Sequence, residues 1–248
     1  MINEMKQTGI STLKFFLIFF AGWLSIGACN KNIDITGNKA YLSVTNLSPN
    51  APPLSIIFEN DTITTSAVPV DSTTGVPGNP YLTAFAGIHD FTIAGDNKAL
   101  VNGNIGLQGN HYYSLFTYDS VSNGKINTLT LQDFLNTPPD TSSSIRFLNF
   151  SSNAISLYLQ MTNSIDTILF SSVPFPFVGS NPNPTILSRL VVIKPGIYDI
   201  KGFLDSLNSP NSFNMGSLSF AAAKIYTIYT RADLSSTDTN SLGVIRHN

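Results

Sequence analysis

Few residues in this chain have the types and spacing that catalysis or metal binding requires. The three histidines, His89, His111 and His247, are far apart in the sequence, whereas a zinc site needs three or four ligands that lie close together. The chain also contains no Gly-x-Ser-x-Gly, phosphate-binding glycine loop or His-Glu-x-x-His motif. We therefore expect no catalytic residue, no metal and no cofactor, and we expect that the protein is not an enzyme.

Cys29 is the only cysteine in the chain, and its position near the N-terminus indicates a chemical role for its thiol. Lys6 and Lys14 precede the apolar run at residues 15–20, and small residues follow, which is the layout of a secretory signal peptide. The apolar stretch at residues 15–28 is shorter than the roughly 20 residues of a membrane-spanning helix. A segment that is removed by processing therefore fits the pattern better than a membrane span.

The end of this segment, Ile-Gly-Ala-Cys at residues 26–29, resembles a bacterial lipobox. The resemblance implies that a diacylglycerol is attached to the sulfur of Cys29 and that residues 1–28 are then removed. Residues 29–38 are polar and lack a clear period, which predicts a flexible tether. We expect a protein bound to a membrane of the cell envelope, the outer membrane being favoured. The alternative is a secreted protein with a cysteine near the cleavage site by chance.

A second pattern places hydroxyl groups directly after aspartates. Asp, then Ser or Thr, then an apolar residue or Thr resembles the O-glycosylation acceptor motif of exported Bacteroidota proteins. The acceptor residues that this resemblance implies are Thr62, Ser72, Ser120, Thr167 and Ser206. The alternative is that Asp-Ser and Asp-Thr pairs simply serve turns and strand edges.

The amino-acid composition limits which fold classes and which kinds of partner are expected. The chain has 248 residues, 42% of them hydrophobic and 11% charged, with a formal net charge of −2. This balance gives no basic surface for a nucleic-acid backbone, so nucleic acid is not an expected partner. Only Glu4 and Glu59 are glutamates, and the polar residues are mostly turn and strand formers, which favours an all-β protein.

One unit occurs twice along the sequence. Leu42, Val44 and Asn46 match Ile145, Phe147 and Asn149 at an offset of 103. Further on, the segment 87–91 matches 196–200, and the segment 113–117 matches 226–230, with offsets that grow only inside loops. We therefore expect a first domain at residues 39–136, a short stiff linker at 137–143 and a second domain at 144–248.

Within each copy, apolar residues alternate with polar ones, which predicts strands with one buried face and one face in solvent. Asn123-Gly124 is the strongest short hairpin signal. Several short strands per copy and no long helical period predict two tandem antiparallel β-sandwiches. The repeated Asn-x-Ser-x-Asn at 46–50 and 149–153 is interpreted as turn chemistry rather than as a ligand loop.

Two further matched positions are interpreted as structural. Tyr113 and Tyr226 occupy the same strand position and are expected to be half-buried rings whose hydroxyl groups are hydrogen-bonded. His89 in the first copy corresponds to Tyr198 in the second. A position that accepts either ring is expected to fill space rather than to bind a metal.

The order of these motifs resembles the family of the domain of unknown function 4397. The resemblance covers most of the chain after residue 38, twice, and implies immunoglobulin-like sandwiches without an assigned activity. Members with a lipobox and tandem copies are typical of Bacteroidota envelope lipoproteins. We expect a lipid-anchored, non-catalytic binding or spacer module whose partner is an envelope protein or a glycan. The alternatives are a purely structural stalk and a hydrolase that uses pairs of aspartates.

Overall fold

The computed structural model describes residues 38–59, 61–154, 156–175, 184–204, 212–231 and 242–248. Cys29, the signal-peptide segment 1–28, nearly all of the tether and Ser206 lie outside the described residues. No helix in the described part of the chain is long and apolar enough to span a membrane. Residues 33–248 form one compact unit.

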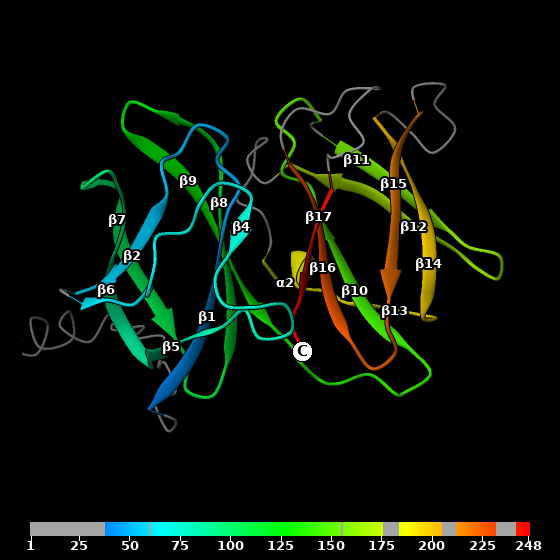
Figure 1. Cartoon of the computed structure of the whole chain (residues 1–248), viewed down its shortest axis with the longest axis horizontal. Coiled ribbons are helices and arrows are strands. Elements are labelled where there is room, and N and C mark those ends of the chain that lie inside the picture. The colour runs from blue at the N-terminus through cyan, green and yellow to red at the C-terminus, as the bar shows by residue number, and fades with distance from the viewer. Residues whose placement is uncertain (1–37, 60, 155, 176–183, 205–211, 232–241) are drawn as a thin grey trace, which may run out of the picture. The chain divides into compact units, whose positions relative to one another are not determined.

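The described strands form four sheets, which make two β-sandwich-like bodies (Figure 1). The first body contains β1 (Lys39–Asn46), β2 (Leu54–Phe58), β3 (Asp61–Thr62), β4 (Ser72–Thr73), β5 (Leu82–Phe85), β6 (Gly87–Gly95), β7 (Lys98–Leu107), β8 (Tyr112–Ser122) and β9 (Lys125–Asp133). The second contains β10 (Ser143–Leu148), β11 (Ser156–Thr162), β12 (Thr167–Pro174), α2 (Pro184–Leu187), β13 (Val191–Ile193), β14 (Gly196–Phe203), β15 (Ser212–Phe220), β16 (Ile225–Thr230) and β17 (Leu242–Arg246). The predicted all-β class is confirmed.

Each body pairs an outer sheet with a central sheet. In the first body the outer sheet has the order β3-β2-β6-β7, and the central sheet has the order β4-β1-β8-β9 with β5 also paired to β1. In the second body the orders are β12-β11-β14-β15 and β13-β10-β16-β17. Strands β1 and β8 are parallel, and so are β10 and β16. The prediction of purely antiparallel sandwiches is therefore wrong for the central sheets, while the immunoglobulin-like topology stays a prediction.

Alternation in the sequence places the two sandwich cores. In β2 the side chains of Leu54 and Ile56 are fully buried, and they pack with Val44 of β1 and Ile93 of β6 in one hydrophobic cluster. A second cluster fills the second body and includes Leu157, Ile200 and Ile228. The Asn123-Gly124 turn between β8 and β9 has positive φ at both residues, 51° and 69°, as the predicted hairpin requires.

The central sheets are buried on both faces, so the expectation of one solvent-exposed face is wrong for them. Every residue from Tyr113 to Tyr118 in β8 is buried, and so is every residue of β10 and β16. The reason is a third hydrophobic cluster to which both bodies contribute. Its members are Leu47, Phe116, Tyr118, Leu129, Leu131, Leu148, Phe150, Phe175, Leu187, Tyr229 and Ile245. The ring centroids of Phe116 and Phe150 are 5.1 Å apart across this contact.

Candidate functional site

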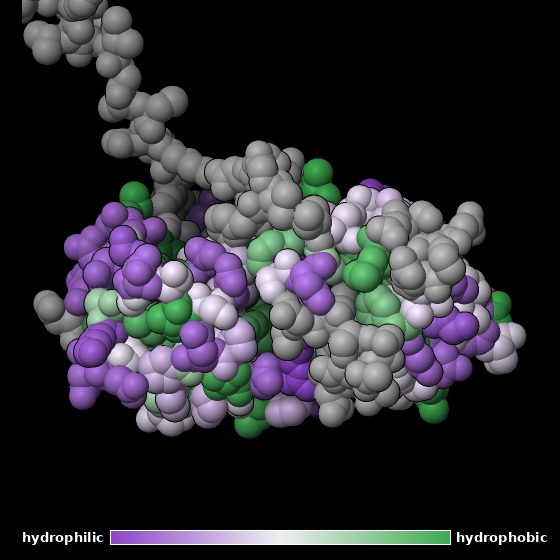
Figure 2. All heavy atoms as spheres, turned by 90° about the horizontal axis from the view of Figure 1, so that it is seen from above, coloured by the Kyte–Doolittle hydropathy of each residue, from purple (hydrophilic) through white to green (hydrophobic). Residues whose placement is uncertain are grey.

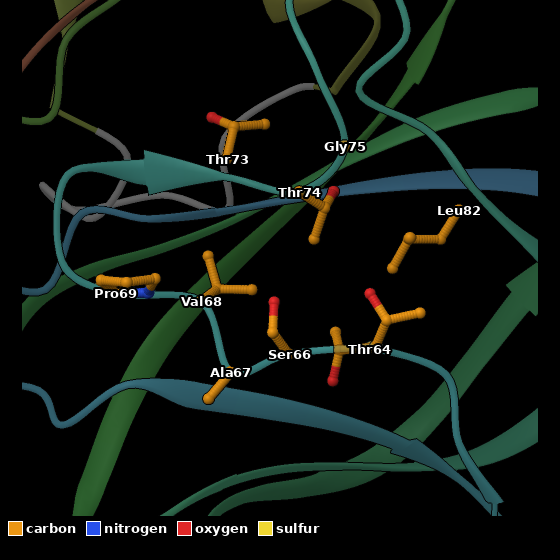
Figure 3. A pocket seen from close by; sticks show the side chains of 10 residues that line it. Thr64, Ser66, Ala67, Val68, Pro69, Thr73, Thr74, Gly75 and Leu82 are labelled. Carbon is orange, nitrogen blue, oxygen red and sulfur yellow. The ribbon is translucent and has the colours of Figure 1, made fainter.

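A small polar groove lies at one edge of the first body, between its two sheets. It has a volume of about 110 Å³ and is lined by residues 64–69, 73–75 and Leu82. Figure 3 shows Thr64, Ser66 and Leu82 directed into the space between these segments. Two of its hydroxyl groups already form hydrogen bonds with backbone groups. Thr64 Oγ1 accepts a bond of 3.2 Å from the Ile56 amide, and Thr74 Oγ1 donates to Pro80 O at 2.7 Å.

A larger groove lies at the corresponding edge of the second body. It has a volume of about 270 Å³, and its lining is mostly apolar: Phe147, residues 169–174, Ile186, Leu187, Arg189 and Val191. Its rim exposes large apolar side chains, because Leu169 is 51% exposed and Ile186 is 69% exposed. Large apolar groups at a surface groove are typical of an interaction site.

The two grooves occupy equivalent places in the two bodies. The carbonyl of Val68 accepts a hydrogen bond from Asn46 Nδ2 at 3.1 Å, and the carbonyl of Val173 accepts one from Asn149 Nδ2 at 3.2 Å. Val68 pairs with Leu54, and Val173 pairs with Leu157. By strand pairing, Leu169 and Phe170 correspond to Thr62 and Ile63. The four residues 64–67 before Val68 are replaced by only two residues, 171–172, before Val173. The corresponding edge is a small polar groove in the first body and a larger, mostly apolar groove in the second.

A third cavity, of about 220 Å³, is lined by residues of both bodies. The turn at residues 75–80 meets β17 there: the Gly78 amide donates to Arg246 O at 3.0 Å, and Arg246 Nη2 donates to Pro77 O at 2.8 Å. A carboxylate of the lining, Asp71, lies 3.5 Å from Arg231. The main polar groups that line the cavity are therefore already engaged in hydrogen bonds and an ion pair that stabilise the fold.

A buried polar network also joins the two bodies. The Arg146 guanidinium lies 2.6 Å from the Asp133 carboxylate, and both side chains are at most 3% exposed. Tyr81 and Ser114 donate hydrogen bonds to Asp133 Oδ2, at 2.9 and 2.7 Å. The charged pair is thus enclosed and hydrogen-bonded, as a buried ion pair must be to persist.

A histidine closes this network. Arg146 Nε donates to Thr227 Oγ1, which lies 2.7 Å from His247 Nε2, while His247 Nδ1 lies 2.6 Å from Tyr81 Oη. Because Tyr81 donates its one proton to Asp133, His247 carries a proton on Nδ1 and donates it to Tyr81 Oη, and in the neutral ring Nε2 accepts from Thr227 Oγ1. Burial agrees with this, since it lowers the pKa of His247 to about 4.

The network can hold the two bodies together, and its charged pair and its histidine lie away from solvent. Arg146, Asp133 and His247 are all buried, and burial, followed by the negative charge of Asp133, raises the pKa of the Tyr81 hydroxyl far above its ordinary value. A proton is therefore hard to remove from Tyr81 or to add to His247 near neutral pH. The sequence predicts no role for His247 or Arg146, although a charged residue between the apolar Ile145 and Phe147 is a signal that Arg146 has a partner.

The predicted acceptor hydroxyls lie apart from each other. Thr62 in β3, Ser120 in β8 and Thr167 in β12 are exposed, and Ser72 in β4 is half-buried. The fifth acceptor, Ser206, is outside the described residues, as is Cys29. Within the described residues, no group of three or more His, Cys, Asp or Glu side chains could hold a metal ion.

The motifs interpreted as structural have the contacts expected of them. Asn46 Oδ1 accepts from the Ser48 amide at 3.2 Å, and Asn149 Oδ1 accepts from the Ser151 amide at 3.1 Å. The hydroxyls of Tyr113 and Tyr226 each accept from an amide five residues upstream, at 2.9 and 3.0 Å. The structural interpretation of these positions is confirmed, but Tyr113 and Tyr226 are buried rather than half-buried.

His89 and Tyr198 also have equivalent contacts. The ring nitrogen His89 Nε2 lies 2.9 Å from Phe85 O, and Tyr198 Oη donates to Lys194 O at 3.0 Å. Each side chain thus bonds the carbonyl four residues before it. The two rings fill the same place, as expected from their alignment.

The first body is similar to a known family of domains. The family model described as Domain of unknown function (DUF4397) matches residues 40–160. The match is to one DUF4397 domain. This DUF4397 match covers the first body and continues through β10 and most of β11. No curated protein matches the chain.

Among solved structures, the chain is similar to three bacterial proteins at low identity. A candidate cell adhesion protein from Bacteroides uniformis has 10% identity and a TM-score of 0.25, over 84% of this chain and 97% of that one. The family CBM26 module CBMbc of Eubacterium rectale Amy13K, in complex with maltoheptaose, has 9% identity and a TM-score of 0.23, over 83% and 95%. A leucine-rich repeat protein from Bacteroides thetaiotaomicron has 10% identity and a TM-score of 0.22. That match covers 80% of this chain and only 27% of the leucine-rich repeat protein. TM-scores this low support no assignment of fold or function.

Proposed function

We propose that this protein is a lipid-anchored binding protein of the cell envelope, in which the DUF4397 domain and a second, related copy form a non-catalytic module. The observation that carries the binding role is the apolar groove of the second body, with its exposed Leu169 and Ile186. A stalk that only spans distance has no use for such a groove. The partner that suits it is an envelope protein rather than a glycan, because few polar groups line the groove.

The proposal of a second copy rests on equivalent contacts. The Asn46 and Asn149 networks, the Tyr113 and Tyr226 hydroxyl bonds and the matching strand orders support it. We therefore propose domains at residues 39–136 and 144–248, joined by the linker 137–143.

The anchor in this proposal is a lipid on Cys29, followed by the tether 29–38. Acyl chains stabilise membrane binding by about 0.8 kcal/mol for each buried CH₂, so two or three chains on one residue hold a protein firmly. The favoured location is the outer membrane.

The test of the anchor is membrane fractionation with a fatty-acid probe. The unaltered protein should be labelled and should sediment with membranes, whereas Cys29→Ala should be unlabelled and soluble. Asn30→Ala, which leaves the four-residue motif intact, is the matched control. Sedimentation of Cys29→Ala with membranes, or an unlabelled native protein, would contradict the anchor.

The face of the membrane can be determined by adding protease to intact cells. Digestion of the described bodies would place them outside the cell, and the proposed partner would then be extracellular. Protection would place the module on the periplasmic side. If pull-downs from envelope extracts return no partner in either case, a purely structural stalk is the better account.

Glycosylation of the exposed Thr62, Ser120 and Thr167, and of Ser72 and Ser206, is part of the same proposal. Intact mass of the protein from its native host tests it. A mass equal to that of the unmodified polypeptide, after allowance for lipid, would refute the proposed glycosylation.

A further inference from the structure

Single exposed apolar side chains are common on this protein. Figure 2 shows several of them, in green, scattered among polar residues on the face that it presents. Such residues need no special explanation. The corner between β5 and β6 differs from them, because it combines Phe85, at 72% the most exposed large apolar side chain of the described residues, with Ile88 at 65%.

This corner lies where the tether joins the first body. The Ala86 amide donates a hydrogen bond to Asn38 O at 3.3 Å, and Phe85 pairs with Lys39 at the start of β1. Residues 29–38 number ten, and ten residues span at most about 36 Å. A lipid on Cys29 would therefore keep the corner within about that distance of the membrane surface.

Tyrosine rings continue the corner along the face of the central sheet that points away from the first core. Tyr41 and Tyr112 are half-buried, and their rings stack with centroids 4.6 Å apart and planes 15° apart. Tyr41 pairs with Thr83 in the register, on the same face of the sheet as Phe85. Tyrosine suits the boundary between water and lipid, because its ring is apolar and its hydroxyl group is polar.

The corresponding corner of the second body lacks these aromatic residues. Lys194 stands at the position of Phe85, and Ser144 and Ile225 stand where the first body has the stacked tyrosines. Ile197, which is 66% exposed, is the counterpart of Ile88. A feature that the fold itself required would occur in both copies, whereas the aromatic corner occurs in the copy that is joined to the tether.

We infer that this corner is a membrane-contact surface, made of Lys39, Phe85, Ile88 and the stacked tyrosines, which rests on the lipid bilayer that holds the anchor. Phe85 and Ile88 enter the boundary between headgroups and acyl chains, and Lys39 keeps its ammonium group among the headgroups. The lipid alone would leave the body free to turn on its tether, whereas this second contact fixes which side faces the membrane. The inference rests on the proposed lipid anchor.

Burial of apolar groups, rather than charge, drives this contact. Lys39 is exposed, and the Glu59 carboxylate lies 3.3 Å from His89 Nδ1, whose other ring nitrogen lies 2.9 Å from Phe85 O. The basic and acidic side chains at the corner thus offset each other. The contact should therefore form on neutral phosphatidylcholine and should persist at high salt, which screens charges.

The test is a fluorescence measurement on the lipid-anchored protein, purified from its host and reconstituted into phosphatidylcholine vesicles. Cys29 is the only cysteine of the chain, and its sulfur is acylated in this proposal. A cysteine introduced elsewhere is then the one free thiol for the polarity-sensitive fluorophore NBD. Ile88→Cys places the label at the corner, and Ile197→Cys places it at the equivalent exposed position of the second body. A lipid with a spin label on its acyl chain serves as the quencher.

We expect the emission of the label at position 88 to shift to shorter wavelength on vesicles and to be quenched by the spin-labelled lipid, at low and at high salt. The label at position 197 should show neither effect.

A second substitution tests the aromatic side chain. Adding Phe85→Ser to Ile88→Cys should lower the ratio of lipid-exposed to water-exposed label by about tenfold, because burial of a Phe side chain favours lipid over water by at least that factor. Adding Lys194→Ser, at the equivalent position of the second body, should leave this ratio unchanged. The two label lifetimes give the ratio, and unfolding midpoints show whether each variant is folded.

Three results would overturn the inference. These are a label at position 88 that stays in water on a membrane-bound protein, equal quenching at positions 88 and 197, and self-association in detergent that Phe85→Ser abolishes. The first of these leaves the anchor standing, because the protein is then held by its lipid without the contact. Uptake of the label by Cys29 itself would instead refute the anchor, and with it the contact that depends on the anchor.

Discussion

The buried ion pair between the two bodies gives the sharpest prediction about stability. Asp133→Asn keeps the shape of the side chain but removes its charge, and it leaves the Arg146 guanidinium, 3% exposed, without its anionic partner. Loss of one partner of a buried pair costs about 3–5 kcal/mol. We therefore expect the free energy of unfolding to fall by about that amount.

The chain supplies a matched control for this substitution. Asp71 and Arg231 form a second ion pair, at 3.5 Å, whose side chains are 47% and 26% exposed. An exposed pair contributes about 0–1 kcal/mol. Asn also tolerates the positive φ of 60° at Asp71. Asp71→Asn should therefore lower the free energy of unfolding by no more than about 1 kcal/mol.

Urea unfolding followed by circular dichroism measures both effects. Adding Arg146→Met to Asp133→Asn removes the unpaired charge, so the double variant should be more stable than the sum of the two single losses. If Asp133→Asn costs less than about 1 kcal/mol, or if the two substitutions are additive, the network does not join the bodies as described.

Three further predictions follow from single side chains. Burial lowers the pKa of His247 to about 4. As the pH falls, His247 is therefore protonated near pH 6.5 in the unfolded chain but only near pH 4 in the folded chain. The free energy of unfolding should decrease by up to about 3 kcal/mol between these two pH values. Urea unfolding at several pH values measures this, and an equally steep fall in His247→Gln would contradict it. Asn149→Ala removes bonds to Ser151, Ala154 and Thr230 and should cost about 1–3 kcal/mol in urea unfolding; a loss no larger than that of Asn136→Ala, an exposed control, would refute the role of the Asn network. A Cβ at Gly243 would overlap the Tyr229 ring, whereas one at Gly103 meets nothing within 4 Å. Gly243→Ala should thus lower the unfolding temperature clearly and Gly103→Ala should hardly change it, and equal effects would show that the Tyr229 contact is loose.

The sequence was informative about local structure. Alternation located the strands that bury Leu54 and Ile56, and Asn123-Gly124 marked the hairpin between β8 and β9. Asn46 corresponds to Asn149 in the two sequence copies, and His89 corresponds to Tyr198. These correspondences indicated structural roles, which the hydrogen bonds of these side chains confirm. These features depend on neighbouring residues, which is why a single sequence contains them.

The packing of the central sheets was not predictable in the same way. Thr227 and Tyr229 in β16 alternate with apolar residues, as they would on a strand that faces water, yet both are buried against the other body. Alternation reports which side of a strand a residue is on, but not what lies beyond that side. Ion pairing of Arg146 with Asp133 and parallel pairing of β1 with β8 likewise depend on how separate strands come together in space.

The most direct test of the central claim is the mass of the N-terminal peptide of the protein purified from membranes of its native host. The account predicts a peptide that begins at Cys29 and carries the added mass of a diacylglycerol. A peptide that still contains residues 26–28, or one with a free thiol at Cys29, would contradict a lipid-anchored envelope protein.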